Sequence, residues 1–354
     1  MKVLFLTRYG PRGASSRYRT YQYLPKLREA GIDGDVLPLL DDSYLRRRYK
    51  GASGNVFEVA AAYIKRALKV GDAGGYDLVW AEKELFPWLP APLELASWPR
   101  GVPVVLDYDD AMHHRYGRHG QAIVRGMLGG KIPKLIACSA AVVVGNAYLA
   151  EYARSNGANR VEVIPTVVDV AGYRKKQSYA TESLKMCWIG SPVTSKYLAM
   201  IAGPLRRFAE KHSCELVLIG GGDLDLKGVP VKHVDWAPDT EAEAIRNCDV
   251  GLMPLPDDPW ERGKCGLKLI QYMAAGLPII ASPIGINNDI VEDGVNGFLA
   301  SGDEQWIACI EELNASESLR SGFGEQGRRK VEKYYDLSVT ASVLSRVLLE
   351  VAHR

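Results

Sequence analysis

Strand-like and helix-like segments alternate along this sequence from end to end. KVLFLT (2–7) is a short apolar run, and similar runs follow at 76–82, 102–110, 140–146 and 161–169. Each run ends in polar residues, and the stretches between them, such as YRTYQYLPKLREAGI, place apolar residues at helical spacing. This alternation is typical of a parallel sheet with helices on both faces, so we predict an α/β fold.

The pattern starts again after a hydrophilic interruption. The stretch 173–183 has no apolar period and is predicted to be a linker. LKMCWIGSP (184–192) then repeats the first strand and its loop, a helix is predicted over 197–212, and further strands are predicted at 214–222, 231–236, 248–255, 277–285 and 296–300. We therefore predict two Rossmann-like, doubly wound parallel-sheet domains, 1–172 and 184–337, that face a cleft. A C-terminal helix over 338–354 follows, and fold analogy suggests that it packs back on the first domain.

Composition excludes several classes of protein. Six cysteines are scattered without a CxxC pair, which favours reduced thiols in a cytoplasmic protein over a disulfide framework or a zinc site. The apolar run at the start is too short for a signal peptide, and no run of about 18 apolar residues exists that would span a membrane.

Charge is distributed unevenly between the two halves. Residues 1–180 carry 26 Lys/Arg and 17 Asp/Glu, whereas residues 181–354 carry 18 and 25. The first domain is therefore expected either to face an anionic partner or simply to expose solvated basic helix faces. No nucleic-acid partner is predicted.

The stretch GKCGLKLIQYMAAGLP (263–278) predicts an anion site. Gly263 and Gly266 bracket a turn before a helix that begins near Leu267, and the first amides of that helix have no intrahelical partner. Lys264 and Lys268 add positive charge beside these amides, so a diphosphate could bind there. The alternative is an ordinary helix start with exposed lysines.

Polar clusters also follow two strands of the first domain. VVLDYDDAMHH (104–114) places three carboxylates and two histidines at a strand end, a composition suited to proton transfer or polarisation. The same residue types could hold a divalent metal or merely cap a loop. The glycine- and arginine-rich loop 8–19 follows the first strand and could meet an anion.

The segments CDVGLMPL and KCGLKLIQYMAAGLPIIASPIGINNDIVEDGVNGFLA resemble the donor-binding half of the family 4 retaining glycosyltransferases, which have the GT-B fold. VEVIPTVVD, NAYLAEYA and ASSRYRTYQYLPKLREAGI extend the resemblance over most of the chain. It implies that the second domain binds a nucleotide-diphosphate sugar and that the first holds a glycan or lipid-linked hydroxyl acceptor. It implies no cofactor and no metal, and a role in surface polysaccharide, lipopolysaccharide or glycolipid biosynthesis.

The sequence departs from the family pattern at several positions. Gly263 and Gln271 stand where the family carries two glutamates, so sugar contact would pass to Glu261, or to Asp257 or Asp258. Gln271 could still bind a ribose through its amide. Asp109 stands near the usual position of a histidine.

The predicted site residues fall into three groups. Asp109 and Glu261 are the predicted catalytic residues. The predicted donor-binding residues are Lys264, Cys265, Gly266, Leu267, Lys268, Gln271, Ser191, Lys196 and Trp236, where Ser191 replaces a family arginine and Trp236 would stack on the base. The predicted acceptor or cleft residues are Gly13, Arg17, Glu82 and His113.

Two alternative functions, and the role of the basic surface, stay open from the sequence. The same fold serves sugar-nucleotide epimerases, and the missing glutamate at 263 would also suit a non-catalytic nucleotide-sugar-binding protein. Basic stretches such as YLRRRYK (44–50) would fit peripheral attachment of the first domain to the inner face of the cytoplasmic membrane, or would be a solvated surface.

Overall fold

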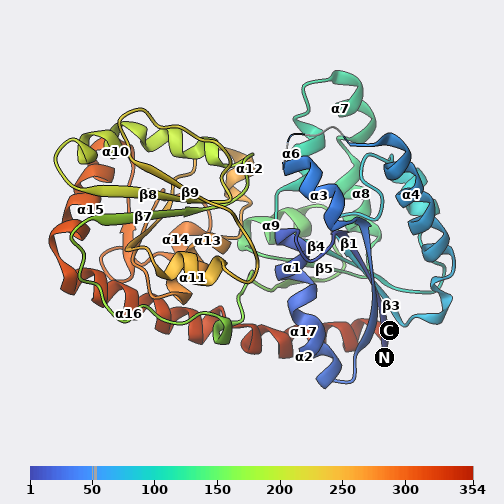
Figure 1. Ribbon diagram of the computed structural model, residues 1–354. Coiled ribbons are helices and arrows are strands. Elements are labelled where there is room, and N and C mark those ends of the chain that lie inside the picture. Colours follow the sequence, from blue (N-terminus) through green and yellow to red (C-terminus); the bar gives the residue numbers. More distant parts are fainter. Residues whose placement is uncertain (50, 52–53, 354) are drawn as a thin grey trace. The chain divides into compact units, whose positions relative to one another are not determined.

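The computed structural model describes residues 1–49, 51 and 54–353, so Lys50 of the basic stretch and Arg354 of the C-terminal segment lie outside the described residues. The chain forms two compact units (Figure 1). The first comprises Met1–Thr166, Arg262–Cys265 and Leu337–Arg354, and the second comprises Val167–Glu261 and Gly266–Asp336.

The first unit is built on a six-stranded parallel sheet with the strand order β2-β1-β3-β4-β5-β6. Its strands are β1 (Lys2–Tyr9), β2 (Asp33–Leu40), β3 (Leu78–Glu82), β4 (Val104–Tyr108), β5 (Ala141–Val144) and β6 (Val161–Val163). The central strands β3, β4 and β5 are buried along their whole length, as expected for strands covered on both faces. Strand β2 was not predicted, because this edge strand is acidic, largely accessible and interrupted by Pro38.

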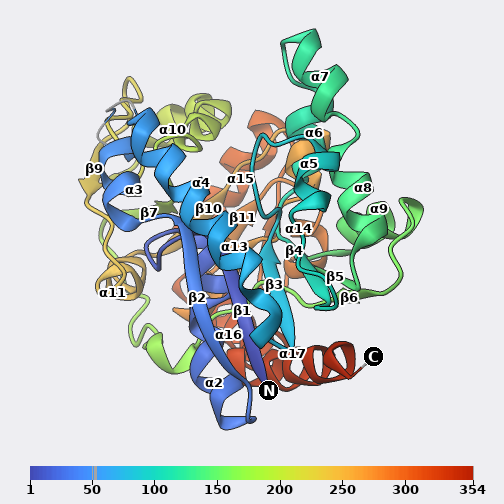
Figure 2. The ribbon, with the colours of Figure 1, turned by 90° about the vertical axis from the view of Figure 1, so that its right-hand side faces the viewer.

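Helices surround this sheet. They are α1 (Ala14–Arg19), α2 (Leu24–Glu29), α3 (Asp42–Tyr49), α4 (Val56–Gly71), α5 (Ala91–Ala96), α6 (Met112–Gly117), α7 (Ala122–Leu128), α8 (Lys131–Cys138), α9 (Ala147–Ser155) and α17 (Leu337–Ala352), with short 3₁₀ turns η1 (Tyr21–Tyr23) and η2 (Ala73–Gly75). Helix α4 packs along β2, and α7 stands away from the sheet (Figure 2).

Helix α17 belongs to the first unit, where it contacts β3 and α2. The Tyr23 hydroxyl lies 2.8 Å from Thr340 Oγ1, and Arg160 donates to Glu350 at 2.6 Å. These polar contacts hold both ends of the helix, while Leu344, Val347 and Leu348 supply its buried face.

The second unit repeats the architecture, with the strand order β12-β11-β10-β7-β8-β9. Its strands are β7 (Leu184–Ile189), β8 (Cys214–Ile219), β9 (Val231–Val234), β10 (Val250–Met253), β11 (Ile279–Ala281) and β12 (Gly297–Leu299). Its helices are α10 (Ala202–Ala209), α11 (Glu241–Arg246), α12 (Pro259–Arg262, whose last residue is counted with the first unit), α13 (Leu267–Ala274), α14 (Asn287–Ile290), α15 (Gly302–Ala315) and α16 (Glu317–Tyr334), with the 3₁₀ segments η3 (Val170–Gly172) and η4 (Ser195–Ile201).

Two faces of this second sheet are filled in different ways. On one face, Trp188 of β7 joins Leu205 and Phe208 of α10 and Ile310 of α15 in a hydrophobic core. On the other, the Tyr272 hydroxyl of α13 accepts from the Ile189 amide at 3.0 Å. Figure 1 shows α10 and α13 on opposite sides of the strands. The sheet is therefore doubly wound, as predicted.

Proline divides two helices that were predicted to be continuous. The segment 18–32 forms α1, η1 and α2, with Pro25 in the first turn of α2. The segment 197–212 begins as the 3₁₀ segment η4, and α10 starts just before Pro204. A proline is tolerated in a first helical turn because its missing N–H would have no intrahelical partner there.

Among the described residues, no helix combines the length and the apolar character that crossing a membrane requires.

Candidate functional site

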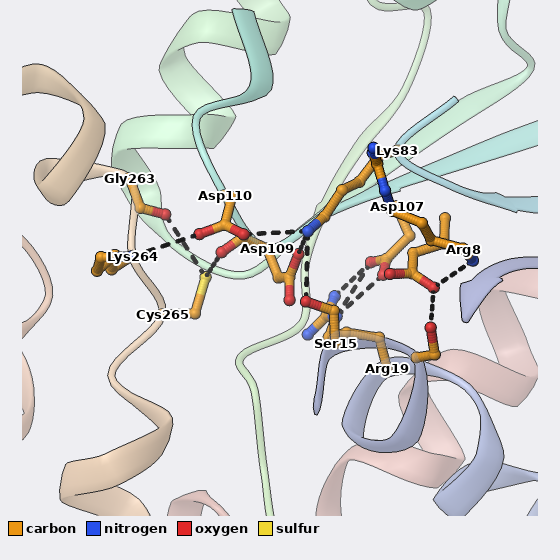
Figure 3. Close-up of polar contacts among 12 residues, drawn as sticks. Arg8, Ser15, Arg19, Lys83, Asp107, Asp109, Asp110, Gly263, Lys264 and Cys265 are labelled. Atoms are coloured by element: carbon orange, nitrogen blue, oxygen red, sulfur yellow. Dashed lines mark hydrogen bonds and ion pairs between the residues drawn. The ribbon is translucent and has the colours of Figure 1, made fainter. Parts of the chain in front are cut away.

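The carboxyl ends of β3 and β4 bring several acidic residues of the first unit together (Figure 3). Glu82 ends β3, and Asp107, Asp109 and Asp110 lie at or just after the end of β4. Because β3 and β4 are parallel neighbours, their carboxyl ends meet at one edge of the sheet. The structure thus brings together the strand ends that the sequence singled out.

Lys83 connects the two carboxylates that follow β4. Its Nζ lies 2.9 Å from Asp109 Oδ1, donates to Asp110 Oδ2 at 3.0 Å and contacts Ser15 Oγ at 3.3 Å. Burial lowers the pKa of Lys83, but Asp109 and Asp110 outweigh it and the pKa is raised. Burial likewise pushes the pKa of Asp109 upward, and Lys83 and Ser15 reverse this so that the pKa lies below its ordinary value. Asp109 is therefore held as a carboxylate.

The Lys83 backbone is in the left-handed region, with φ of 68°. A non-glycine residue there costs about 1–3 kcal/mol. Sequence reasoning missed Lys83, and the only available signal was a lysine directly after a strand-ending glutamate.

The remaining acids at this edge have structural partners. Arg19 holds Asp107 with both carboxylate oxygens within 3.2 Å and donates to the Ile164 carbonyl at 2.7 Å. Glu82 accepts from Ser16 Oγ at 2.5 Å and from the Arg8 amide at 2.9 Å. Burial raises the pKa of both Asp107 and Glu82.

The segment Arg262–Cys265 packs on the same edge of the first unit. Asn146 Nδ2 donates to the carbonyls of Gly263 and Lys264 at 3.1 and 3.0 Å, and the Cys265 thiol donates to the Asp109 carbonyl at 3.2 Å. Lys264 Nζ lies 3.9 Å from Asp110 Oδ1. Burial raises the pKa of Cys265, so its thiol stays protonated.

Gly263 has no room for a side chain in this packing. A Cβ at this position would lie 2.5 Å from the Ala111 Cβ and 2.9 Å from the Ala111 amide nitrogen. Because backbone atoms form part of the contact, a rotamer change could not relieve it. The glutamate that the resemblance leads one to expect at 263 has no place in this structure.

In the second unit, α13 begins without a side-chain cap. Its N-cap, Gly266, has φ of 67° and offers no side-chain cap, and no acidic residue lies in the first turn. Lys268 Nζ lies 4.4 Å from the centroid of the Trp188 indole, a cation–π distance. The helix start is positively charged by its dipole and by Lys268, which suits an anion.

The other predicted donor residues, and the predicted catalytic residue Glu261, are held by local contacts of the second unit. Gln271 is buried and donates to the Tyr173 hydroxyl at 3.0 Å, and the buried carboxylate of Glu261 accepts from the Tyr197 hydroxyl. Lys196 lies over the Tyr197 ring at 5.6 Å, and Ser191 Oγ is 3.4 Å from Thr194 Oγ1. Trp236 Nε1 donates to Glu241 Oε2 at 2.7 Å. Their roles toward a donor stay predictions.

The predicted acceptor residues are more scattered. His113 stacks on Tyr152 with centroids 3.6 Å apart, and burial, then His114, lowers its pKa to about 4. Arg17 donates to the Tyr18 hydroxyl at 3.1 Å, and Gly13 is the N-cap of α1. In the described part of the chain, no group of three or more His, Cys, Asp and Glu residues is arranged to hold a metal ion.

Comparisons with known proteins identify the architecture. The chain superposes on sucrose-phosphate synthase from Thermosynechococcus elongatus with a TM-score of 0.74, 15% identity and 99% coverage of both chains. Anabaena Alr3699/HepE in complex with UDP and glucose gives 0.73, with 14% identity and coverage of 99% and 100%. The fold is GT-B.

Sequence comparisons match parts of this chain to glycosyltransferases. Residues 184–315 match the family described as Glycosyl transferases group 1. The phosphatidyl-myo-inositol mannosyltransferase of Mycolicibacterium smegmatis is 26% identical over 207 residues, 54% of this chain and 52% of that protein. Its counterpart in Mycobacterium leprae is 30% identical over 148 residues, 39% of this chain and 38% of that protein. The chain thus spans about half the length, or less, of these curated relatives. The matched part of the chain is thus similar to glycosyltransferases, and the fold of the chain is GT-B.

Proposed function

We propose that this protein is a retaining glycosyltransferase of family 4 that moves a sugar from a nucleotide-diphosphate sugar to a hydroxyl acceptor. The observation that carries the proposal is the match of residues 184–315 to Glycosyl transferases group 1, on a chain with the GT-B fold. The solved complex of Anabaena Alr3699/HepE with UDP and glucose is consistent with a nucleotide-sugar donor.

In this proposal, α13 receives the donor diphosphate. The amides at the N-terminus of α13 and the Lys268 ammonium stabilise the negative charge that grows on the departing diphosphate in the transition state. Lys264, which precedes the helix by three residues in the chain, adds a second ammonium. Leaving-group stabilisation by fixed amides and lysines requires no metal ion, so we propose metal-independent transfer.

In the same proposal, Asp109 accepts hydrogen bonds from the reacting hydroxyls. A carboxylate with a lowered pKa accepts hydrogen bonds only, so Asp109 positions sugar or acceptor hydroxyls by their protons. Glu261 takes over sugar contact from the absent glutamate, because Gly263 has no room for a side chain.

The proposed acceptor is a glycan or a lipid-linked hydroxyl at the inner face of the cytoplasmic membrane. Helix α4 supports a peripheral contact, since Val56, Phe57, Ile64 and Leu68 are exposed on it. Lys65 and Lys69 lie on the same helix, so it combines apolar surface with positive charge. The matched relatives carry the name phosphatidyl-myo-inositol mannosyltransferase.

Calorimetric titration with a panel of nucleotide-diphosphate sugars tests the donor site. A Lys264→Ala variant is expected to bind the preferred donor about 10-fold more weakly than the parent, because a charge-assisted contact to phosphate is lost. Lys185→Ala is the matched control, since this exposed lysine lies at the start of β7, and its affinity should equal the parent's. Parental affinity in Lys264→Ala would refute the phosphate role of Lys264.

A further inference from the structure

The ammonium of Lys83 contacts two adjacent carboxylates at the edge of the first sheet. Lys83 Nζ is within 3.0 Å of both Asp109 and Asp110, and the Lys83 side chain is only 7% exposed (Figure 3). Two carboxylates that contact one ammonium repel each other, so loss of the cation would disfavour the ionised form of Asp109. The position of Lys83 offsets that repulsion.

The other charged groups around Asp109 do not replace Lys83. Arg19 acts on Asp109 through space, but its guanidinium is engaged by Asp107 and the Ile164 carbonyl. Lys264 lies beside Asp110 at 3.9 Å. The acidic groups near Asp109 are Glu82, Asp107, Asp110 and the protonated Cys265 thiol, and none of them supplies a positive charge. Lys83 is the cation that directly contacts Asp109 among these groups.

The backbone conformation at position 83 does not favour a lysine. The presence of Lys83 is therefore explained by its ammonium group and not by local chain geometry. Lys83 and Trp88 are the two non-glycine residues with positive φ in the described chain. A glycine or an asparagine would adopt φ of 68° more easily than a lysine. The lysine is therefore strained at a place where a neutral residue would fit better.

We propose that Lys83 is a positioning residue that holds Asp109 as a carboxylate beside Asp110 and fixes it for the hydroxyls that it binds. The inference rests on the proposed function, in which Asp109 accepts hydrogen bonds from the reacting hydroxyls. Lys83 itself need not touch the substrate, because its effect passes through the two carboxylates.

The test compares Lys83→Asn with Lys83→Arg. Asparagine tolerates positive φ but carries no charge, whereas arginine keeps the charge. The acid limb of kcat/KM against pH is expected to move upward by about one pH unit or more in Lys83→Asn, because loss of the neighbouring cation raises the pKa of Asp109. In Lys83→Arg the limb should stay near that of the parent. A merely structural role would lower the melting temperature and leave the limb in place.

A second readout does not depend on activity. Carboxyl carbon NMR, with Asp109→Asn to assign the Asp109 signal, should show the same upward shift of its titration in Lys83→Asn. Absence of turnover in the parent, with this shift present, would refute the proposed function and leave the electrostatic role of Lys83 standing. Turnover with an unshifted limb and an unshifted titration would overturn the inference alone. If Lys83→Asn does not fold, Lys83→Gly gives the same comparison, since glycine suits the backbone.

Discussion

Replacing Asp109 with asparagine is expected to lower kcat for sugar transfer by about 100-fold or more. Asparagine has the shape of aspartate, but it carries no charge and presents a donor where the carboxylate only accepts. Contributions of positioned acid or base groups to catalysis are typically of this size or larger. The rate of nucleoside diphosphate release, measured at saturating donor and at pH 8, checks the prediction.

The matched control is Asp72→Asn, because Asp72 is an exposed aspartate of the first unit at the end of α4. This variant should keep the parental kcat. Circular dichroism must show that Asp109→Asn is folded, since Lys83 loses one of its two carboxylate partners in that variant. A folded Asp109→Asn protein with parental kcat would contradict the role assigned to Asp109.

Replacing Lys131 with methionine is expected to reduce the free energy of unfolding by about 3–5 kcal/mol at pH 8. Lys131 is fully buried on α8, where its Nζ lies 2.6 Å from Glu84 Oε2 and 2.8 Å from Glu94 Oε2. Both carboxylates are fully buried too. Removal of the lysine leaves two acids in the core without their cation, and this uncompensated charge accounts for the large cost.

The loss of stability in Lys131→Met should become smaller as the pH falls. Burial raises the pKa of Glu94 to about 7 even with Lys131 opposing the shift. The folded state thus holds this proton more tightly than the unfolded chain, and the associated stability is present below pH 4.5 and lost as the pH rises through about 7. Without Lys131 the folded-state pKa rises further, so the difference between variant and parent should shrink as the pH falls from 8 to 5.

Urea unfolding at pH 8 and pH 5 measures both effects. Lys134→Met is the control, because Lys134 lies exposed on the same helix and its loss should change stability by less than about 0.5 kcal/mol. Equal stability of Lys131→Met and the parent at pH 8 would mean that the buried ion pairs do not hold α8 to the sheet.

The fold could be predicted largely from apolar periodicity, and the exceptions have local causes. Buried strands such as β4 and β10 consist almost entirely of apolar residues, so they stand out in the sequence. Strand β2 does not, because it lies at the edge of its sheet. Pro25 and Pro204 are visible in the sequence as residues that interrupt a helix. Apolar periodicity alone, however, does not distinguish the 3₁₀ segments that precede them from α-helix.

The candidate site was predictable only where a strand end fixes a side chain. Asp109 follows β4 directly, and its place at the edge of the sheet follows from the parallel topology. Lys83 turns toward Asp109 through a left-handed backbone, which no sequence pattern for lysine indicates. The lack of space at Gly263 depends on Ala111, a residue 152 positions away in the chain.

Turnover of a nucleotide-diphosphate sugar tests the central claim most directly. The protein is incubated with a panel of such donors, with and without glycan or glycolipid acceptors, and release of nucleoside diphosphate is followed. We expect one donor to be consumed, at a rate that an acceptor increases and that Asp109→Asn lowers by about 100-fold or more. Absence of both binding and release for every donor in the panel would contradict the claim that this protein is a glycosyltransferase.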